Sequence, residues 1–136
     1  MKTHKACDTI LLILRIILGI IFMAHGAQKL FGIFGGKGIP GTISMIKSLG
    51  FILPVFFAWI LAISEFFGGL GVVLGIFPRI SSASISIVML VAIFTIHISN
   101  GFFNKNGGIE FNLLLIGVAI SIFIAGAGKF SLYNKY

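Results

Sequence analysis

The sequence predicts an all-α integral membrane protein whose helices form a four-helix bundle. Apolar residues make up 58% of the 136-residue chain and the mean hydropathy is +1.16, more than a soluble domain of this size needs. Four apolar runs approach the length that crosses a bilayer. The 18 glycines agree with this class, because glycine lets membrane helices approach one another closely.

The first predicted span covers about residues 9–27. Lys2 and Lys5 precede it, and basic residues before an apolar run also occur in cleaved signal peptides. Arg15 interrupts the apolar region, which argues against cleavage. We therefore expect this segment to remain as a membrane helix.

One face of this helix carries its polar and smallest residues. At about 100° per residue, they fall within a stripe about 120° wide. The stripe consists of Asp8, Arg15, Gly19, Phe22, His25, Gly26 and Lys29. The opposite face is made of Ile and Ala, so it should contact lipid while the stripe contacts protein or a polar cavity.

Residues 28–53 are expected to form a glycine-rich loop followed by a short interfacial helix. Five glycines and one proline between positions 32 and 41 favour bends. The segment from Thr42 to Leu49 is amphipathic but too short to cross the bilayer, so it should lie at the membrane interface.

Three further spans complete the predicted bundle, at about residues 54–76, 80–98 and 111–125. Pro78 and Arg79 predict a tight turn before the third span, and a polar turn separates the last two. No linker divides the chain, so residues 1–136 are expected to form one domain.

Four spans place both termini on one side of the membrane, and the basic residues favour the cytoplasm by a difference of one. The side of the termini carries Lys2, Lys5, Arg79, Lys129 and Lys135. The other side carries Lys29, Lys37, Lys47 and Lys105. The positive-inside rule then predicts a multi-pass protein of the inner (plasma) membrane with cytoplasmic termini.

The net charge of +7 does not indicate a nucleic-acid partner. The basic residues are scattered at segment ends and form no patch with interleaved aromatic residues. Anionic lipid headgroups explain them better, so the bilayer is the expected partner. The lone Cys7 excludes an internal disulfide.

Two charges fall inside predicted spans. Arg15 lies about 10 Å and Glu65 about 14 Å from the side of the termini, at about 1.5 Å per residue. Because an unpaired charge in hydrocarbon is costly, we predict a buried Arg15–Glu65 ion pair. A purely structural role for this pair stays open. Around Glu65, small residues predict a close helix–helix contact; they are Ala58, Ala62, Gly68 and Gly69.

A second polar group is expected near the opposite membrane surface. His25 and His97 come to the same depth, and Lys29, Asn100 and Glu110 fall near that level. We predict that these five residues bind a ligand, with phenylalanines holding its apolar tail and the polar side chains binding its oxygens. Histidines at helix ends can instead be simple interfacial anchors, and this alternative stays open.

The residue types at this level disfavour a tightly bound metal or haem. His25 and His97 form a bis-histidine set, but they lack any further haem context. Zinc is disfavoured because Glu110 is the one further ligand. A quinone is the cofactor that a pocket for a headgroup and a tail would suit.

Several fragments together resemble the DoxX family of small four-helix membrane proteins. They are R-x3-G-x5-HG-x2-K-L-F-G at 15–32, A-x2-E-x2-GG at 62–69, P-R at 78–79, A-x-F-T-x-H-x2-NGFF at 92–103 and NGG-x-E at 106–110. Members of this family resemble the membrane subunit of thiosulfate:quinone oxidoreductase, and others the membrane partner of an assembly linking thiol and superoxide defence. The resemblance matches the polar motif residues to Arg15, His25, Lys29, Glu65, His97, Asn100 and Glu110.

Two functions from different classes follow. The first is a redox-associated membrane subunit that binds a quinone, with electrons supplied by a partner or substrate. The alternative is a non-enzymatic membrane partner or assembly factor, supported by the small-residue face of the 54–76 span and by the absence of a complete catalytic constellation. Association with a redox partner or with a second copy stays open. Solute transport is disfavoured because four helices enclose little lumen.

Overall fold

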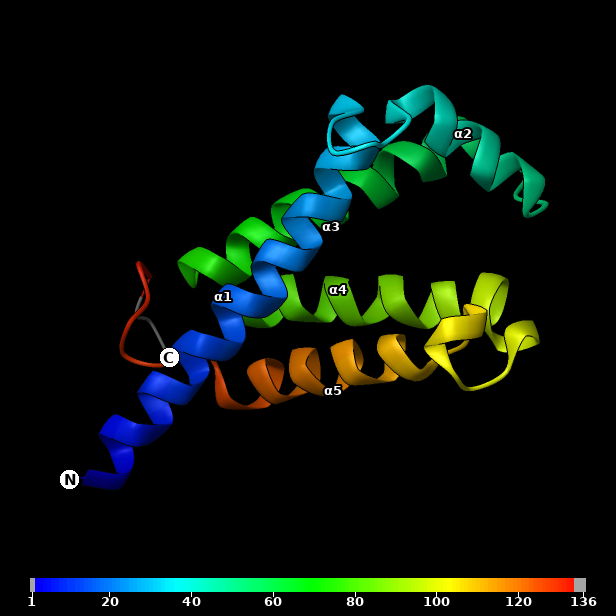
Figure 1. The fold of residues 1–136 in the computed structure, drawn as a ribbon. Coiled ribbons are helices and arrows are strands. Elements are labelled where there is room, and N and C mark those ends of the chain that lie inside the picture. Colours follow the sequence, from blue (N-terminus) through cyan, green and yellow to red (C-terminus); the bar gives the residue numbers. More distant parts are fainter. Residues whose placement is uncertain (1, 134–136) are drawn as a thin grey trace.

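The computed structural model describes residues 2–133, with side chains from residue 4 onward, and this part of the chain is all-α (Figure 1). Its five α-helices are α1 Lys2–Phe31, α2 Gly38–Ser48, α3 Pro54–Leu74, α4 Pro78–Ala92 and α5 Glu110–Ala125. A π-helical turn, η1 Ile93–His97, continues α4, and two short 3₁₀ turns follow, η2 Ile98–Asn100 and η3 Asn104–Asn106. Lys135, which entered the charge count, lies outside the described residues.

Three helical segments are long and apolar enough to cross a membrane. They cover His4–Phe31, Pro54–Leu74 and Pro78–Asn100. The last apolar helix, α5, has 16 residues and is therefore about 24 Å long, shorter than a hydrocarbon core of about 30 Å. The predicted all-α class is confirmed, with three helices of spanning length in the described chain.

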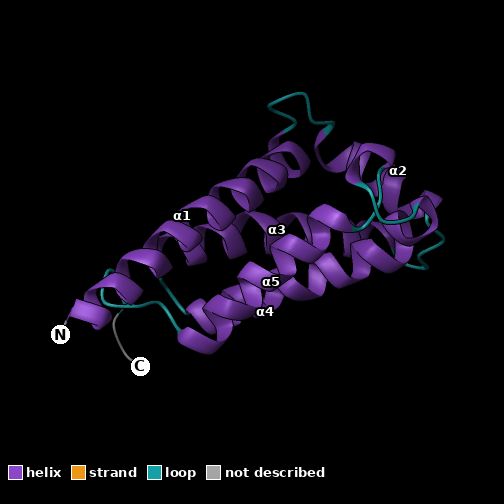
Figure 2. Ribbon diagram, turned by 60° about the horizontal axis from the view of Figure 1, so that its bottom comes forward, coloured by secondary structure: helices purple, strands orange, loops and turns teal. Residues whose placement is uncertain are grey.

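The helices pack as two antiparallel pairs (Figures 1 and 2). α1 packs along α3, and α4 packs along α5. Contacts between α3 and α4 join the pairs, and α2 packs against α1 and α3. The buried apolar core includes Leu18, Phe22, Val72, Ile85, Met89, Ile93, Leu115, Ile116, Ala119 and Ile122.

Glycines bring α1 and α3 into close contact. A Cβ added at Gly26 would come within 2.6 Å of the Phe66 Cα, and one at Gly69 within 2.7 Å of the Gly19 carbonyl oxygen. Larger side chains here would force the backbones apart, so small residues are required at this contact. On the opposite side of α1, Ile17 and Ile20 are exposed, as expected for a face that meets lipid.

The small-residue face of α3 is covered by this chain's own helices. Ala58 and Ala62 are 0% exposed, and Gly69 packs on α1. Gly68 faces Ile85 of α4, since a Cβ at Gly68 would lie 3.5 Å from that side chain. The predicted close helix–helix contact is therefore internal, and this face offers no free surface to a partner.

The segment between the first two long helices differs from the prediction at both ends. α1 continues past residue 27 to Phe31, and a residue with positive φ, Gly32 at +67°, ends it. α2 begins at Gly38 rather than at Thr42, with Pro40 in its first turn, where proline needs no backbone donor. The loop is therefore shortened to residues 32–37.

Arg15 is buried within the protein and binds backbone oxygens. Its side chain is 1% exposed. The guanidinium donates to the carbonyls of Val72, Val73, Ala127 and Phe130 at 2.8, 2.8, 2.6 and 2.8 Å. Carbonyls in the last turn of a helix lack intrahelical partners and carry the negative end of the helix dipole, so the end of α3 is a favourable site for a cation.

The predicted Arg15–Glu65 ion pair is therefore not formed. The prediction rests on the depths of the two residues along their helices. Depth does not show that α3 ends beside Arg15, where the carbonyls of its last turn accept hydrogen bonds from the guanidinium. Glu65 instead binds a different cation, Lys29 of α1.

Two further hydrogen bonds fix the segment after α5, which Arg15 also contacts. The backbone N–H of Lys129 donates to the Asp8 carboxylate at 3.0 Å, and that of Leu132 donates to the Leu74 carbonyl at 3.0 Å. The segment after α5 is thus held against the start of α1 and the end of α3.

We predict that Arg15→Met destabilises the fold by about 3–5 kcal/mol. Hydrogen bonds to a charged group contribute about 1.5–3 kcal/mol each and are not additive, and the substitution leaves several carbonyls without a donor. The exposed Arg79 supplies the matched control, Arg79→Met, with an expected change within about 0.5 kcal/mol. Unfolding in mixed micelles measures both, and equal stabilities of the two variants would contradict the role of Arg15.

Candidate functional site

A cavity of about 450 Å³ lies between the two helix pairs, at the end away from Arg15. It is lined by residues 21–29 of α1, 57–65 of α3, the second half of α4 with η1, and the start of α5. α2 contributes Met45, Ile46 and Leu49. The volume lies in the range of small-molecule sites, about 300–1,000 Å³.

Most of the cavity wall is apolar. The aliphatic and aromatic residues include Ile21, Phe22, Phe51, Phe57, Ile60, Leu61, Ile87, Val88, Val91, Ile96, Phe111 and Leu115. Such a wall holds a ring or a hydrocarbon chain, whereas orientation must come from the few polar groups. Those are His25, Lys29, Glu65, Thr95, His97, Asn104 and Asn112.

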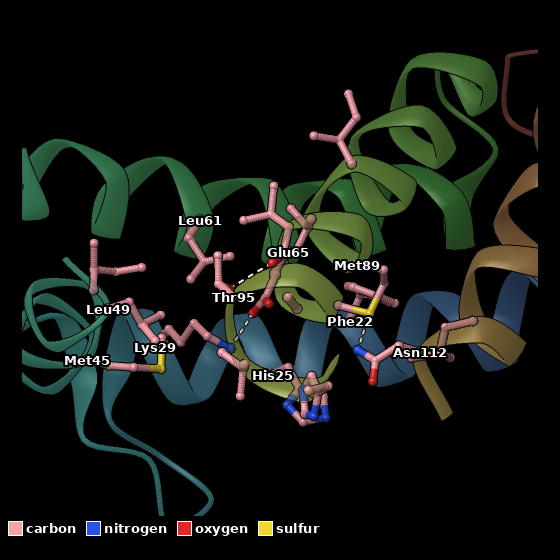
Figure 3. A pocket seen from close by; sticks show the side chains of 18 of the residues that line it. Phe22, His25, Lys29, Met45, Leu49, Leu61, Glu65, Met89, Thr95 and Asn112 are labelled. Carbon is pink, nitrogen blue, oxygen red and sulfur yellow. Dashed lines mark hydrogen bonds and ion pairs between the residues drawn. The ribbon is translucent and has the colours of Figure 1, made fainter. Parts of the chain in front are cut away.

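An ion pair joins α1 to α3 in the cavity wall. The Lys29 Nζ donates to the Glu65 Oε2 at 2.6 Å, and Figure 3 shows the two side chains meeting there. The Glu65 side chain is 6% exposed and that of Lys29 is 20% exposed. The carboxylate is thus compensated, while the ammonium keeps two further donors for a ligand.

The two histidines also line the cavity. His25 is exposed on α1, and His97 is half-buried at the end of η1. The His97 Nδ1 lies 2.7 Å from the Gly107 carbonyl, which can only accept. Nδ1 is therefore the donor in this contact, and Nε2 is the ring atom left for a ligand.

The π-helical turn η1 places three residues in the wall, Thr95, Ile96 and His97. π-turns are rare inside α-helices and are frequent at functional sites. The extra residue in this turn changes which side chains of the α4 continuation face inward. The sequence carries no signal for it, because hydrophobic periodicity assumes a regular helix.

Two of the five predicted ligand residues do not line the cavity. Asn100 donates from Nδ2 to the Gly107 carbonyl at 3.3 Å. Glu110 accepts from the backbone N–H of Asn104 at 2.9 Å. Both side chains are exposed, and their hydrogen bonds stabilise the conformation of the connection between η2 and α5. The structure therefore brings together His25, Lys29 and His97 but leaves Asn100 and Glu110 outside.

Glu65 and Asn112 join the cavity wall without having been predicted there. The sequence predicts Glu65 in a separate buried pair and places Asn112 inside the apolar span 111–125. The signal for Asn112 was present, since an amide within residues 111–125 is the kind of intramembrane polar residue that marks a site. Among the described residues, no group of three or more His, Cys, Asp or Glu side chains is arranged to hold a metal ion.

Comparisons with known proteins agree with the family resemblance. The DoxX family model matches residues 10–98. A Bacillus subtilis protein named "Putative oxidoreductase CatD" is 33% identical over 124 residues, which cover 91% of this chain and 84% of that protein. An "Uncharacterized protein" of Haemophilus influenzae is 27% identical over 130 residues, covering 90% of this chain and 87% of its own length. No solved structure matches the chain.

We predict that the Lys29–Glu65 pair couples α1 to α3 energetically. Glu65→Gln or Lys29→Met alone should lower the free energy of unfolding by about 3 kcal/mol, because each leaves one charge without its partner. The double variant should recover part of that loss. A double-mutant cycle in mixed micelles measures the coupling, and strictly additive losses would show that the pair does not stabilise the fold.

Proposed function

The chain belongs to the DoxX family of membrane proteins, and we propose that it serves as a redox-associated membrane subunit that binds a quinone. The observation that carries this proposal is the cavity, which combines an apolar wall with the Lys29–Glu65 pair and two histidines. A quinone has the matching chemistry, a polar ring with carbonyl oxygens and an apolar tail.

The polar groups suit both forms of such a ring. Lys29 can donate to a carbonyl oxygen of the oxidised ring while it remains bound to Glu65. The Nε2 of His97 can accept from a hydroxyl of the reduced ring, because Nδ1 is engaged with Gly107. The name of the Bacillus relative supports a redox role, and we propose that a partner protein or substrate exchanges electrons with the ligand.

We further propose how the helices lie in the membrane. α5 is the fourth span and completes a four-helix bundle, residues 32–37 form a glycine-rich loop at the far surface, and α2 lies in that interface. The contacts of the segment after α5 with Asp8 and Leu74 support termini on one side. The basic residues then favour the cytoplasm for that side.

Tag accessibility tests the orientation. A cysteine-free chain, with Cys7→Ser, carries a single reporter cysteine added after the C-terminus or in the 32–37 loop. An impermeant thiol reagent applied to intact cells should label the loop reporter and leave the C-terminal reporter unlabelled. Labelling of the C-terminal reporter with protection of the loop would reverse the proposed orientation.

Ligand titration tests the function. Protein in nanodiscs should bind a short-chain benzoquinone, and Lys29→Met should weaken that binding about tenfold, the effect of losing one charge-assisted hydrogen bond. His25→Ala should also weaken it. Lys47→Met is the matched control, because Lys47 is exposed on α2 and does not line the cavity.

An absence of saturable quinone binding in the wild-type protein would reject the proposal. The alternative, a non-enzymatic membrane partner or assembly factor, would then be the function to test. The small-residue face of α3 no longer supports that alternative, because α1 and α4 cover it.

A further inference from the structure

Asn112 is a buried amide that the protein leaves incompletely bonded. Its side chain is 6% exposed, lies in the first turn of α5 and lines the cavity. The Nδ2 donates to the Met89 sulfur at 3.5 Å, and thioether sulfur is a weak acceptor. None of the hydrogen bonds within residues 4–133 uses the Asn112 Oδ1, and no fully buried side-chain oxygen or nitrogen there lacks a partner, so this oxygen keeps surface open to the cavity.

An amide in this position is unfavourable unless something completes its hydrogen bonds. The amide oxygen faces a mostly apolar cavity, where water or a ligand must supply its partner, and an apolar residue would pack beside Met89 without that requirement. The assignment of the two amide atoms does not alter this argument, because turning the amide over exchanges oxygen and nitrogen but still leaves one of them without a protein partner.

Asn112 enters the cavity from a different side than the ion pair. Lys29 and Glu65 belong to the α1–α3 pair of helices, whereas Asn112 and Met89 belong to the α4–α5 pair. In Figure 3 the Lys29–Glu65 contact and the Asn112–Met89 contact are drawn apart, and the Phe22 label stands beside the Asn112–Met89 contact. Both helix pairs therefore contribute polar groups to the cavity wall, and Asn112 is the polar residue that α5 contributes.

We infer that Asn112 is a second ligand-binding residue and that the ligand carries two oxygens at separate positions of one ring. One oxygen binds at the Lys29–Glu65 pair and the other at Asn112. This inference rests on the proposed function and specifies the ligand class as a 1,4-quinone and its quinol. An amide suits both forms, since its oxygen accepts from a quinol hydroxyl and, once turned over, its NH₂ donates to a quinone carbonyl.

Two probes that differ by one oxygen test this inference. The first is a decyl-substituted 1,4-benzoquinol kept under anaerobic conditions, and the second is the decylphenol that lacks the second hydroxyl. Wild-type protein in nanodiscs should bind the quinol about tenfold more tightly than the phenol, which corresponds to about 1.4 kcal/mol. Asn112→Leu should abolish this preference while leaving the affinity for the phenol unchanged.

A matched control and a second variant accompany this test. Ser121→Leu changes an exposed polar residue of the same helix that does not line the cavity, so it should keep the full preference. Asn112→Ser keeps a smaller polar group and should give an intermediate preference, which tests the inference even if Asn112→Leu fails to fold.

The outcomes separate this inference from the proposed function. A preference for the quinol that is unchanged in both Asn112 variants overturns the role of Asn112 and leaves the proposed function standing. Equal loss of affinity for both probes in Asn112→Leu also overturns the inference, because Asn112 would then only shape the cavity. Failure of the wild-type protein to bind either probe overturns the proposed function itself.

Discussion

The hydrogen bonds of Arg15 to four backbone carbonyls are the interaction on which the rest of the structure depends. A membrane offers no water to its interior charges, so each must be satisfied by the protein. Arg15 meets this constraint with backbone carbonyls, since no acidic side chain among the described residues pairs with it, and in doing so it joins α1, the end of α3 and the segment after α5. Four of its five N–H groups donate to these carbonyls, and Glu65 instead binds Lys29, at the other end of the helices.

This division gives the two ends of the protein different properties. Near Arg15, hydrogen bonds from its guanidinium to backbone carbonyls hold α1, the end of α3 and the segment after α5 together. Gly19 and Gly69 allow the backbones of α1 and α3 to pack in direct contact. Toward α2, the α1–α3 and α4–α5 pairs enclose a cavity whose wall holds an ion pair, two histidines and an incompletely bonded amide. The closely packed end thus provides a rigid support for the cavity and its polar side chains at the other end, and binding sites generally need such support.

The sequence was sufficient for the helices and insufficient for the partners of the charged residues. Hydropathy and helical periodicity predicted the long spans and the buried stripe of α1, because both depend on local residue order. The prediction of an Arg15–Glu65 pair is wrong, because depth along a helix does not fix which side chains face each other. The backbone carbonyls that Arg15 binds also have no signal in the sequence. His25, Lys29 and His97 line one cavity, whereas Asn100 and Glu110 hydrogen-bond within the connection before α5. The π-helical turn has no signal in the sequence, because hydrophobic periodicity assumes a regular helix. Asn112 does have one, since an amide within an apolar span indicates a polar site.

Native mass spectrometry of the protein released from its own membrane tests most directly whether the cavity is a ligand site. The instrument weighs the intact protein with whatever molecule it retains, so no ligand has to be guessed. The account predicts a retained molecule of quinone mass at close to one per chain, with strong depletion in Lys29→Met and full retention in Lys47→Met. Recovery of the wild-type chain free of any such molecule, or carrying phospholipid alone, would contradict it.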